Sequence, residues 1–139
     1  MSFLPEDDQE FLLENDIKHE LLAEKLPDGT DRRGVLFPRF AFTGNLWTGQ
    51  NGNFAPCTAC DLLVLIPSGY ATTKLDSFYT LAHLKRPNGT DPQNATVVQA
   101  LFQKNWQFWS RHLEDADWRV GKDGLRTFLS YIRNELRNA

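Results

Sequence analysis

The chain has 139 residues and a formal net charge of −3, and 41% of its residues are hydrophobic while 24% are charged. These proportions fit one ordinary globular domain over 1–139, long enough to bury a core. There is no basic stripe to neutralise phosphates and no apolar run near the ~20 residues of a membrane span. Two cysteines without a secretion signal favour the cytoplasm. We therefore expect a cytoplasmic protein that binds neither nucleic acid nor membrane.

The N-terminal segment predicts a helix and then a β-hairpin. A proline followed by three acids suits a first helical turn, so we expect a helix over 5–14. Apolar residues occur at strand-like density over 17–25 and again over 34–41. The Pro-Asp-Gly-Thr turn at 27–30 separates these two segments, which predicts that they pair as antiparallel strands.

The middle of the chain predicts more strands. The glycine- and asparagine-rich segment 44–56 is expected to be a loop or a wide hairpin end. Five consecutive apolar residues, Leu62–Ile66, predict a central strand covered on both faces. Residues 75–80 predict one more strand, and the polar, proline-interrupted segment 83–94 predicts a loop.

Two helices are expected to close the chain. The first would begin near 92–95, because the apolar residues Phe102, Trp106, Trp109 and Leu113 recur at helical spacing. The second has a clearer apolar stripe over 125–136, with Asp123 as its N-cap. The predicted fold class is therefore α+β, with an antiparallel meander of about four strands covered by helices.

Three features of the sequence resemble the ubiquitin-conjugating enzyme superfamily. Trp118 follows Ser110 by eight residues, which is the family's interval between the nucleophilic cysteine and a tryptophan that opens a loop before a helix. The segment 66–70, Ile-Pro-Ser-Gly-Tyr, resembles the family's Phe-Pro-x-x-Tyr-Pro turn, with Ala71 in place of the last proline. The Trp-Ser-Arg-His segment at 109–112 is most similar to the divergent prokaryotic branch called family E.

This resemblance implies a fold and a function. The fold would be UBC-like: an N-terminal helix, a four-stranded antiparallel meander, an active-site segment and C-terminal helices. The implied partners are a ubiquitin-like modifier, an activating enzyme and a protein substrate, and no cofactor is implied. The acidic run at 6–10 is most simply a solvated helix face, and the resemblance adds a docking role toward the activating enzyme.

Ser110 stands where the superfamily has its cysteine, so the implied acyl carrier is an oxyester. A serine hydroxyl needs a base, and His112 is the nearby candidate. In a regular helix these two side chains would point about 200° apart, so the pairing requires Ser110–His112 to be irregular. The alternative is that both are ordinary helix residues.

Other residues of the implied site have alternative roles. Arg111 would hold a carboxylate or an oxyanion, or is a solvated surface arginine. The family's His-Pro-Asn signature is not intact, because the nearest string is Arg-Pro-Asn at 86–88 and His83 is displaced. Asn88, Asn94 and Asn105 are all conceivable replacements for its asparagine.

The pair Cys57 and Cys60 allows a redox or zinc interpretation. A single Cys-x-x-Cys offers two of the four ligands of structural zinc and leads into a strand rather than a helix, so we expect no metal site. A nucleophile displaced onto this segment is a further alternative. The leading hypothesis is a conjugating enzyme that accepts the modifier and transfers it to an amine. The second is a silent scaffold that binds the modifier or the activating enzyme.

Overall fold

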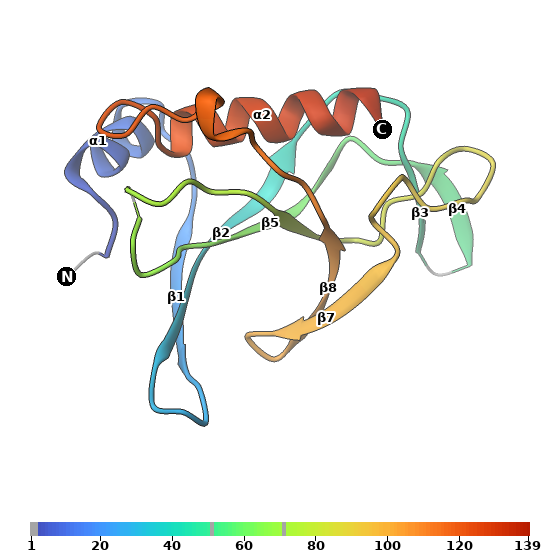
Figure 1. Ribbon diagram of the computed structural model, residues 1–139. Coiled ribbons are helices and arrows are strands. Elements are labelled where there is room, and N and C mark those ends of the chain that lie inside the picture. The colour runs from blue at the N-terminus through green and yellow to red at the C-terminus, as the bar shows by residue number, and fades with distance from the viewer. Residues whose placement is uncertain (1–2, 51, 71) are drawn as a thin grey trace.

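The computed structural model describes residues 3–50, 52–70 and 72–139 of the chain (Figure 1). Within that part it contains two α-helices, one 3₁₀ turn and eight strands. In chain order these are α1 (Glu6–Glu14), β1 (Glu20–Lys25), β2 (Asp31–Ala41), β3 (Trp47–Gln50), β4 (Asn53–Pro56), β5 (Ala59–Leu65), β6 (Phe78–Leu81), β7 (Val97–Leu101), β8 (Lys104–Trp109), η1 (Asp115–Asp117) and α2 (Leu125–Asn138). The predicted α+β class is correct.

Six strands form one curled antiparallel sheet in the order β1-β2-β5-β6-β8-β7, and β3 and β4 form a separate hairpin. The strands β1, β2, β5 and β6 are those predicted from the sequence. The predicted sheet of about four strands had too few strands, because β8 and β7 extend the sheet beyond β6. The β3–β4 hairpin occupies the segment 44–56, where a loop or a wide hairpin end was predicted.

The N-terminal predictions are confirmed. Helix α1 begins directly after Pro5, and β1 pairs with β2 from Glu20 opposite Leu36 to Lys25 opposite Asp31. The turn between them closes with a hydrogen bond from the Leu26 amide to the Thr30 carbonyl oxygen at 2.8 Å. Gly29 supplies the positive φ (+89°) that this turn requires.

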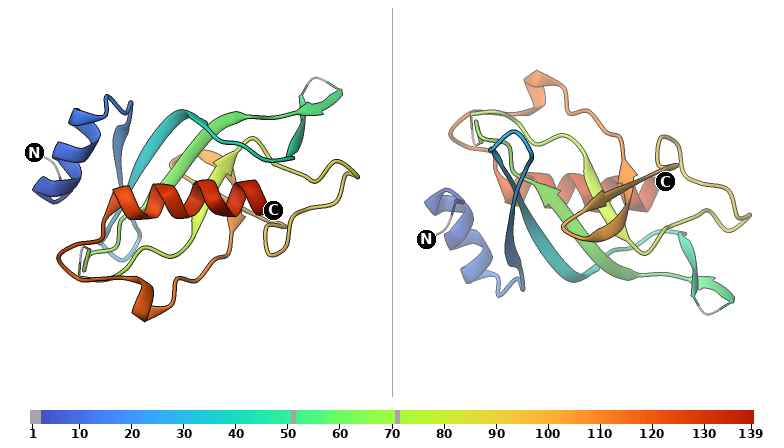
Figure 2. Two further views of the ribbon diagram at one scale, coloured as in Figure 1. Left: turned by 90° about the horizontal axis from the view of Figure 1, so that it is seen from above. Right: turned by 90° about the horizontal axis from the view of Figure 1, so that it is seen from below.

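Helix α2 lies across one face of the sheet, as Figure 2 shows from above and below. Its apolar stripe packs on the strands in the main core, which includes Val35, Phe37, Leu62, Val64, Phe78, Trp109, Leu125, Phe128, Leu129, Ile132 and Leu136. The predicted central strand is confirmed: Leu62, Leu63 and Val64 are fully buried, and β5 lies between β2 and β6. Alternate residues of β5 point to opposite faces of the sheet. Its apolar run is unbroken because both faces are covered by a core.

The other face of the sheet has a second core of its own. Leu36, Leu63, Tyr79, Leu101 and Trp106 are buried there, beneath the curled β7–β8 hairpin. The tip of this hairpin reaches β1 and β2, where the Phe102 ring packs against Gly34. A Cβ atom at position 34 would lie 3.2 Å from that ring and 3.0 Å from the Leu63 side chain. The glycine therefore allows the sheet to curl onto itself.

The predicted helix from about 92–95 to Leu113 was wrong, because this segment forms the β7–β8 hairpin. Phe102 and Gln103 form its turn, and both have positive φ (51° and 66°). The apolar residues at helical spacing in fact lie on opposite faces of the sheet: Trp106 belongs to the second core, whereas Trp109 and Leu113 belong to the main core. A strand buried on both faces can imitate a helical pattern.

Helix α2 is confirmed, but Asp123 is not its N-cap. The helix begins at Leu125 after Gly124, without a side-chain cap from its own segment. The Asp8 carboxylate of α1 accepts the hydrogen bond of the Leu125 amide at 3.0 Å instead. Asp123 accepts bonds from the Arg119 amide (2.6 Å) and the Thr127 hydroxyl (2.8 Å), so it fastens the preceding loop to the helix. Across the described ranges, neither helix is both long and apolar enough to cross a membrane.

A candidate active-site groove around Ser110

Ser110 follows directly after β8 and lies, half-buried, in an open groove of about 570 Å³. One wall is the irregular segment that continues from β8, another is the end of the 83–94 loop, and the third is the C-terminal part of α2. The lining residues are Arg86, Gln93, Asn94, Ser110, Arg111, His112, Tyr131, Glu135, Asn138 and Ala139. Residues 110–114 have no regular secondary structure, so the irregularity that a Ser110–His112 pairing needs is present.

The backbone of Ser110 is held in place by Asn94. The Ser110 amide donates to the Asn94 carbonyl oxygen at 2.9 Å, and Asn94 adopts the left-handed conformation (φ 56°) that asparagine tolerates. The exposed side chain of Asn94 lines the groove beside Ser110. Of the three candidate asparagines, it alone lines the groove. Asn105 pairs with Ala100 near the turn of the β7–β8 hairpin, five residues before Ser110, and the structure does not bring it to the groove.

Arg111 holds the walls of the groove together. Its Nε donates to the Glu135 carboxylate of α2 at 2.6 Å. Its Nη1 donates to the carbonyl oxygens of Gln93 and Ser110, both at 2.9 Å. The guanidinium also lies over the Trp109 ring, 5.1 Å from its centroid. Arg111 is therefore not a solvated surface residue, because it ties the Ser110 backbone to the loop and to α2.

His112 lies in the same groove with 82% of its side chain exposed. Its Nδ1 is 3.4 Å from the Asp76 carboxylate, whose other oxygen accepts the Leu113 amide at 3.0 Å. Within the described part of the chain no hydrogen bond joins the Ser110 hydroxyl to His112. His112 thus turns Nδ1 toward a carboxylate and lines the same groove as Ser110.

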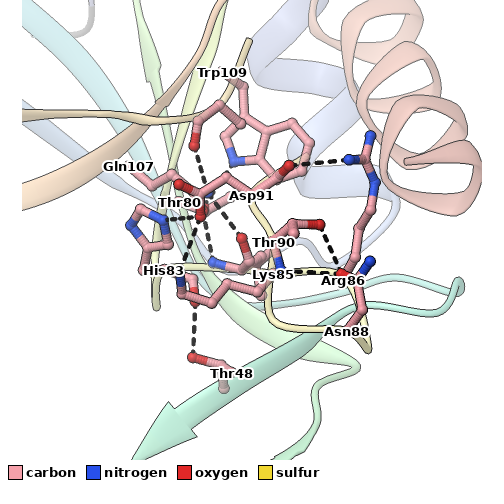
Figure 3. A network of polar contacts seen from close by, with 12 residues as sticks. Thr48, Thr80, His83, Lys85, Arg86, Asn88, Thr90, Asp91, Gln107 and Trp109 are labelled. Atoms are coloured by element: carbon pink, nitrogen blue, oxygen red, sulfur yellow. Dashed lines mark hydrogen bonds and ion pairs between the residues drawn. The ribbon is translucent and has the colours of Figure 1, made fainter. Parts of the chain in front are cut away.

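The loop behind the groove is fastened by a buried polar network (Figure 3). Gln107 of β8 accepts hydrogen bonds from the Thr80 hydroxyl (3.0 Å) and the Leu84 amide (2.7 Å). It donates to the carbonyl oxygens of Leu84 and Ala95, both at 2.9 Å. One buried side chain thus pins both ends of the loop. Asn88 is used inside the loop, where it accepts bonds from the amide and hydroxyl of Thr90.

His83 also belongs to this network rather than to the groove. Its Nε2 lies 2.7 Å from the Asp91 carboxylate, and the Lys85 ammonium lies 3.2 Å from the same oxygen (Figure 3). Burial opposes ionisation of Asp91, but the hydrogen bonds from these two residues keep its pKa below the usual range. The displaced histidine of the Arg-Pro-Asn region therefore stabilises the loop that positions Asn94.

The structure brings two of the resembling motifs into contact. Trp118 is buried, and its ring lies 6.4 Å from that of Tyr70, the last residue of the Ile-Pro-Ser-Gly-Tyr turn. The Tyr70 hydroxyl donates to Asp8 of α1, the carboxylate that also caps α2. Burial, together with this bond, raises the pKa of Tyr70. Ala71, which replaces the second proline of the motif, lies outside the described residues.

The cysteine pair lies away from the groove, with Cys57 between β4 and β5 and Cys60 on β5. Both thiols are free, with Cys57 half-buried and Cys60 buried. Burial raises the pKa of the Cys60 thiol, which makes its thiolate scarce at neutral pH. Across residues 3–50, 52–70 and 72–139, no group of three or more histidine, cysteine or acidic side chains is arranged to hold a metal ion.

The sequence did not predict Glu135, which lines the groove, or Asp76, which contacts His112. Neither lies in a recognisable motif, and each acts on a partner at least 24 positions away in the chain. The helical pattern of the sequence predicts that Glu135 lies on the exposed side of α2. It does not predict that Glu135 pairs with Arg111. Tyr131 also faces the groove, and partial burial followed by the nearby Glu135 charge raises its pKa.

Comparison with known proteins agrees with this architecture. The family model described as Prokaryotic E2 family E matches residues 4–139, which is nearly the whole chain. No curated protein and no solved structure matches the chain. The two helices and the curled antiparallel sheet are consistent with an E2-like fold. The extent of the family match shows that this chain belongs to prokaryotic E2 family E.

Proposed function

We propose that the chain is a conjugating enzyme that carries a ubiquitin-like modifier as an oxyester on Ser110. Membership of prokaryotic E2 family E suggests ubiquitin-like conjugation as the process, with a modifier and an activating enzyme as partners. The observation that carries the assignment to Ser110 is its place in the groove, where its backbone is bonded to Asn94 and flanked by Arg111 and His112.

In the first transfer, the Ser110 hydroxyl attacks the modifier's C-terminal carbonyl carbon, presented by the activating enzyme as an adenylate or a thioester. The new C–O bond forms as the bond to AMP or to the thiol breaks. His112 takes the hydroxyl proton, and Asp76 stabilises the resulting imidazolium. Arg111 and the Asn94 side-chain amide, which line the same groove, are the proposed donors to the developing oxyanion.

In the second transfer, a substrate amine attacks the oxyester carbonyl. The amide bond forms and the bond to Ser110 Oγ breaks, while His112 takes the proton that the amine loses and passes it to the serine oxygen. Aminolysis of an alkyl ester to an amide is downhill, so the obstacle for serine is kinetic. A positioned base lowers this kinetic barrier by taking the proton of the serine hydroxyl. A cysteine would depend less on such a base, because its thiolate forms more easily.

The decisive experiment incubates the chain with its activating enzyme, its modifier and ATP. A covalent adduct on Ser110 should survive brief thiol reduction and yield to hydroxylamine. Ser110→Ala should abolish the adduct, and Ser110→Cys should make it thiol-labile. Ser130→Ala is the matched control, since this serine is exposed on α2 and is not among the residues that line the groove.

Two outcomes would overturn the proposal. If Ser110→Ala forms the adduct as well as the native chain does, the nucleophile is another residue. If no residue is modified while the modifier still binds, the domain is the silent scaffold that was the second hypothesis. Mass spectrometry of the trapped adduct distinguishes the two cases.

A further inference from the structure

A second groove lies on the opposite flank of α2 from Ser110. It has a volume of about 550 Å³ and lies where the end of β2 meets α2 and the segment after α1. Its apolar surface comes from Phe37, Pro38 and Phe40. Residues 131 and 135 line the Ser110 groove, and residue 133 lies on the other side of the helix because two positions correspond to about 200° of rotation.

Three cations line this second groove: Lys18, Arg39 and Arg133. Among the described residues, none of them forms a salt bridge, whereas Lys25, Arg32 and Arg33 of β1 and β2 do. The Arg133 guanidinium lies over the Phe40 ring, 4.6 Å from its centroid. Asp16 is the one carboxylate among the lining residues. In a chain with net charge −3, this is a local excess of positive charge.

The backbone of the groove is strained in two places. Asp16 and Arg39 both have positive φ (51° and 52°), a conformation that costs energy for residues other than glycine. Arg39 lies in a bulge of β2 between Phe37 and Phe40, where the register with β5 shifts. Its amide donates to the Asp61 carboxylate at 3.1 Å, which holds the bulge in place. The bulge turns a cationic residue out of the sheet beside an apolar floor.

We propose that this groove binds an acidic peptide segment of a partner protein, one that places an aromatic or aliphatic side chain between carboxylates. The apolar floor would take the side chain, and the three cations would pair with the carboxylates. A nucleic acid fits less well, because three cations in an acidic chain neutralise too few phosphates. The inference goes beyond the proposed function and does not depend on Ser110.

The test measures fluorescence anisotropy of a labelled peptide with one phenylalanine between pairs of glutamates, titrated with the whole chain alone. A peptide with glutamines in place of the glutamates is the charge control. We expect the acidic peptide to bind at least about tenfold more tightly than the neutral one, because its carboxylates find unpaired cations. Added salt should weaken the acidic peptide selectively.

The double variant Arg39→Asn with Arg133→Gln should lose about tenfold or more in affinity for the acidic peptide. Asparagine keeps a residue that tolerates positive φ at position 39. Arg137→Gln, on the same helix but outside the groove, should bind like the native chain, and thermal unfolding checks that all variants fold.

Equal binding of the two peptides, or equal binding by the double variant, would overturn the proposal. A second contrary result concerns phosphatidylserine vesicles. If the double variant loses binding to these vesicles but still binds the acidic peptide, the groove is a site for a lipid surface and the proposal is overturned. Concentration-dependent dimerisation abolished by the same double variant would assign it to a second copy of the chain. Because the assay contains no modifier or activating enzyme, these results are separate from the adduct experiment.

Discussion

The two grooves on either side of α2 differ in how their charges are balanced. In the Ser110 groove, Arg111 is paired with Glu135 at 2.6 Å and its side chain is only 14% exposed. In the second groove, Arg133 has an aromatic ring beneath it but no carboxylate partner among the described residues. The first groove has its central arginine paired and its geometry fixed, which suits chemistry. The second leaves positive charge for a ligand to compensate, which suits binding.

The largest expected effect comes from removing the proposed base of the first groove. His112→Ala should slow adduct formation by about 10²–10⁴-fold, the usual contribution of a positioned general base. Its side chain is 82% exposed, so the free energy of unfolding should hardly change. Single-turnover adduct formation gives the rate. His19→Ala, an exposed histidine near β1, is the control. An unchanged rate for His112→Ala would mean that another group activates the nucleophile.

Weakening the packing of α2, which lies between the two grooves, should destabilise the fold that forms both of them. Leu129 of α2 is 1% exposed in the main core, so Leu129→Ala should lower the free energy of unfolding by about 2–5 kcal/mol. Leu13→Ala, at an exposed position on α1 (81%), should cost less than ~0.5 kcal/mol. Urea denaturation measures both. A cost at position 129 as small as that at position 13 would mean that α2 does not pack on the sheet as described.

Uncoupling Arg111 from α2 should affect one groove only. Glu135→Gln removes the carboxylate from a half-buried pair and should cost about 1–3 kcal/mol of stability, the range for a hydrogen bond to a charged group. Adduct formation should slow, while acidic-peptide binding in the second groove should stay the same. Glu10→Gln, on the exposed face of α1, is the matched control. Equal losses in both grooves would show that the effect is general unfolding rather than local geometry.

The smallest effect is expected at the cysteine pair, which belongs to neither groove. Cys57→Ser combined with Cys60→Ala should leave the rate of adduct formation unchanged, because Cys57, before β5, and Cys60, on β5, lie outside the Ser110 groove. Alanine is chosen at position 60 because that side chain is buried and a hydroxyl there would need a partner. Complete loss of the adduct in this variant would assign the nucleophile to one of these two cysteines.

Local signals were enough to predict much of this protein. The proline and acids at the start of α1, the Pro-Asp-Gly-Thr turn and the stripe on α2 each act through neighbours in the chain, so their elements were predicted correctly. The eight-residue interval from Ser110 to Trp118 and the Trp-Ser-Arg-His segment are properties of the chain order alone. The branch that this segment resembles, family E, is the one to which the chain belongs. The irregular backbone required around Ser110 and His112 is also present.

Tertiary structure decided the rest, because it depends on which surfaces meet. Residues 97–109 have apolar spacing that fits a helix, and only the presence of a core on each side of the sheet makes them strands. The cap of α2 comes from Asp8, more than a hundred residues away in the chain. The orienting carboxylate at Asp76 and the bulge at Arg39 likewise arise from packing between distant segments. The sequence by itself determined the family and the candidate nucleophile, while the fold determined which side chains surround it.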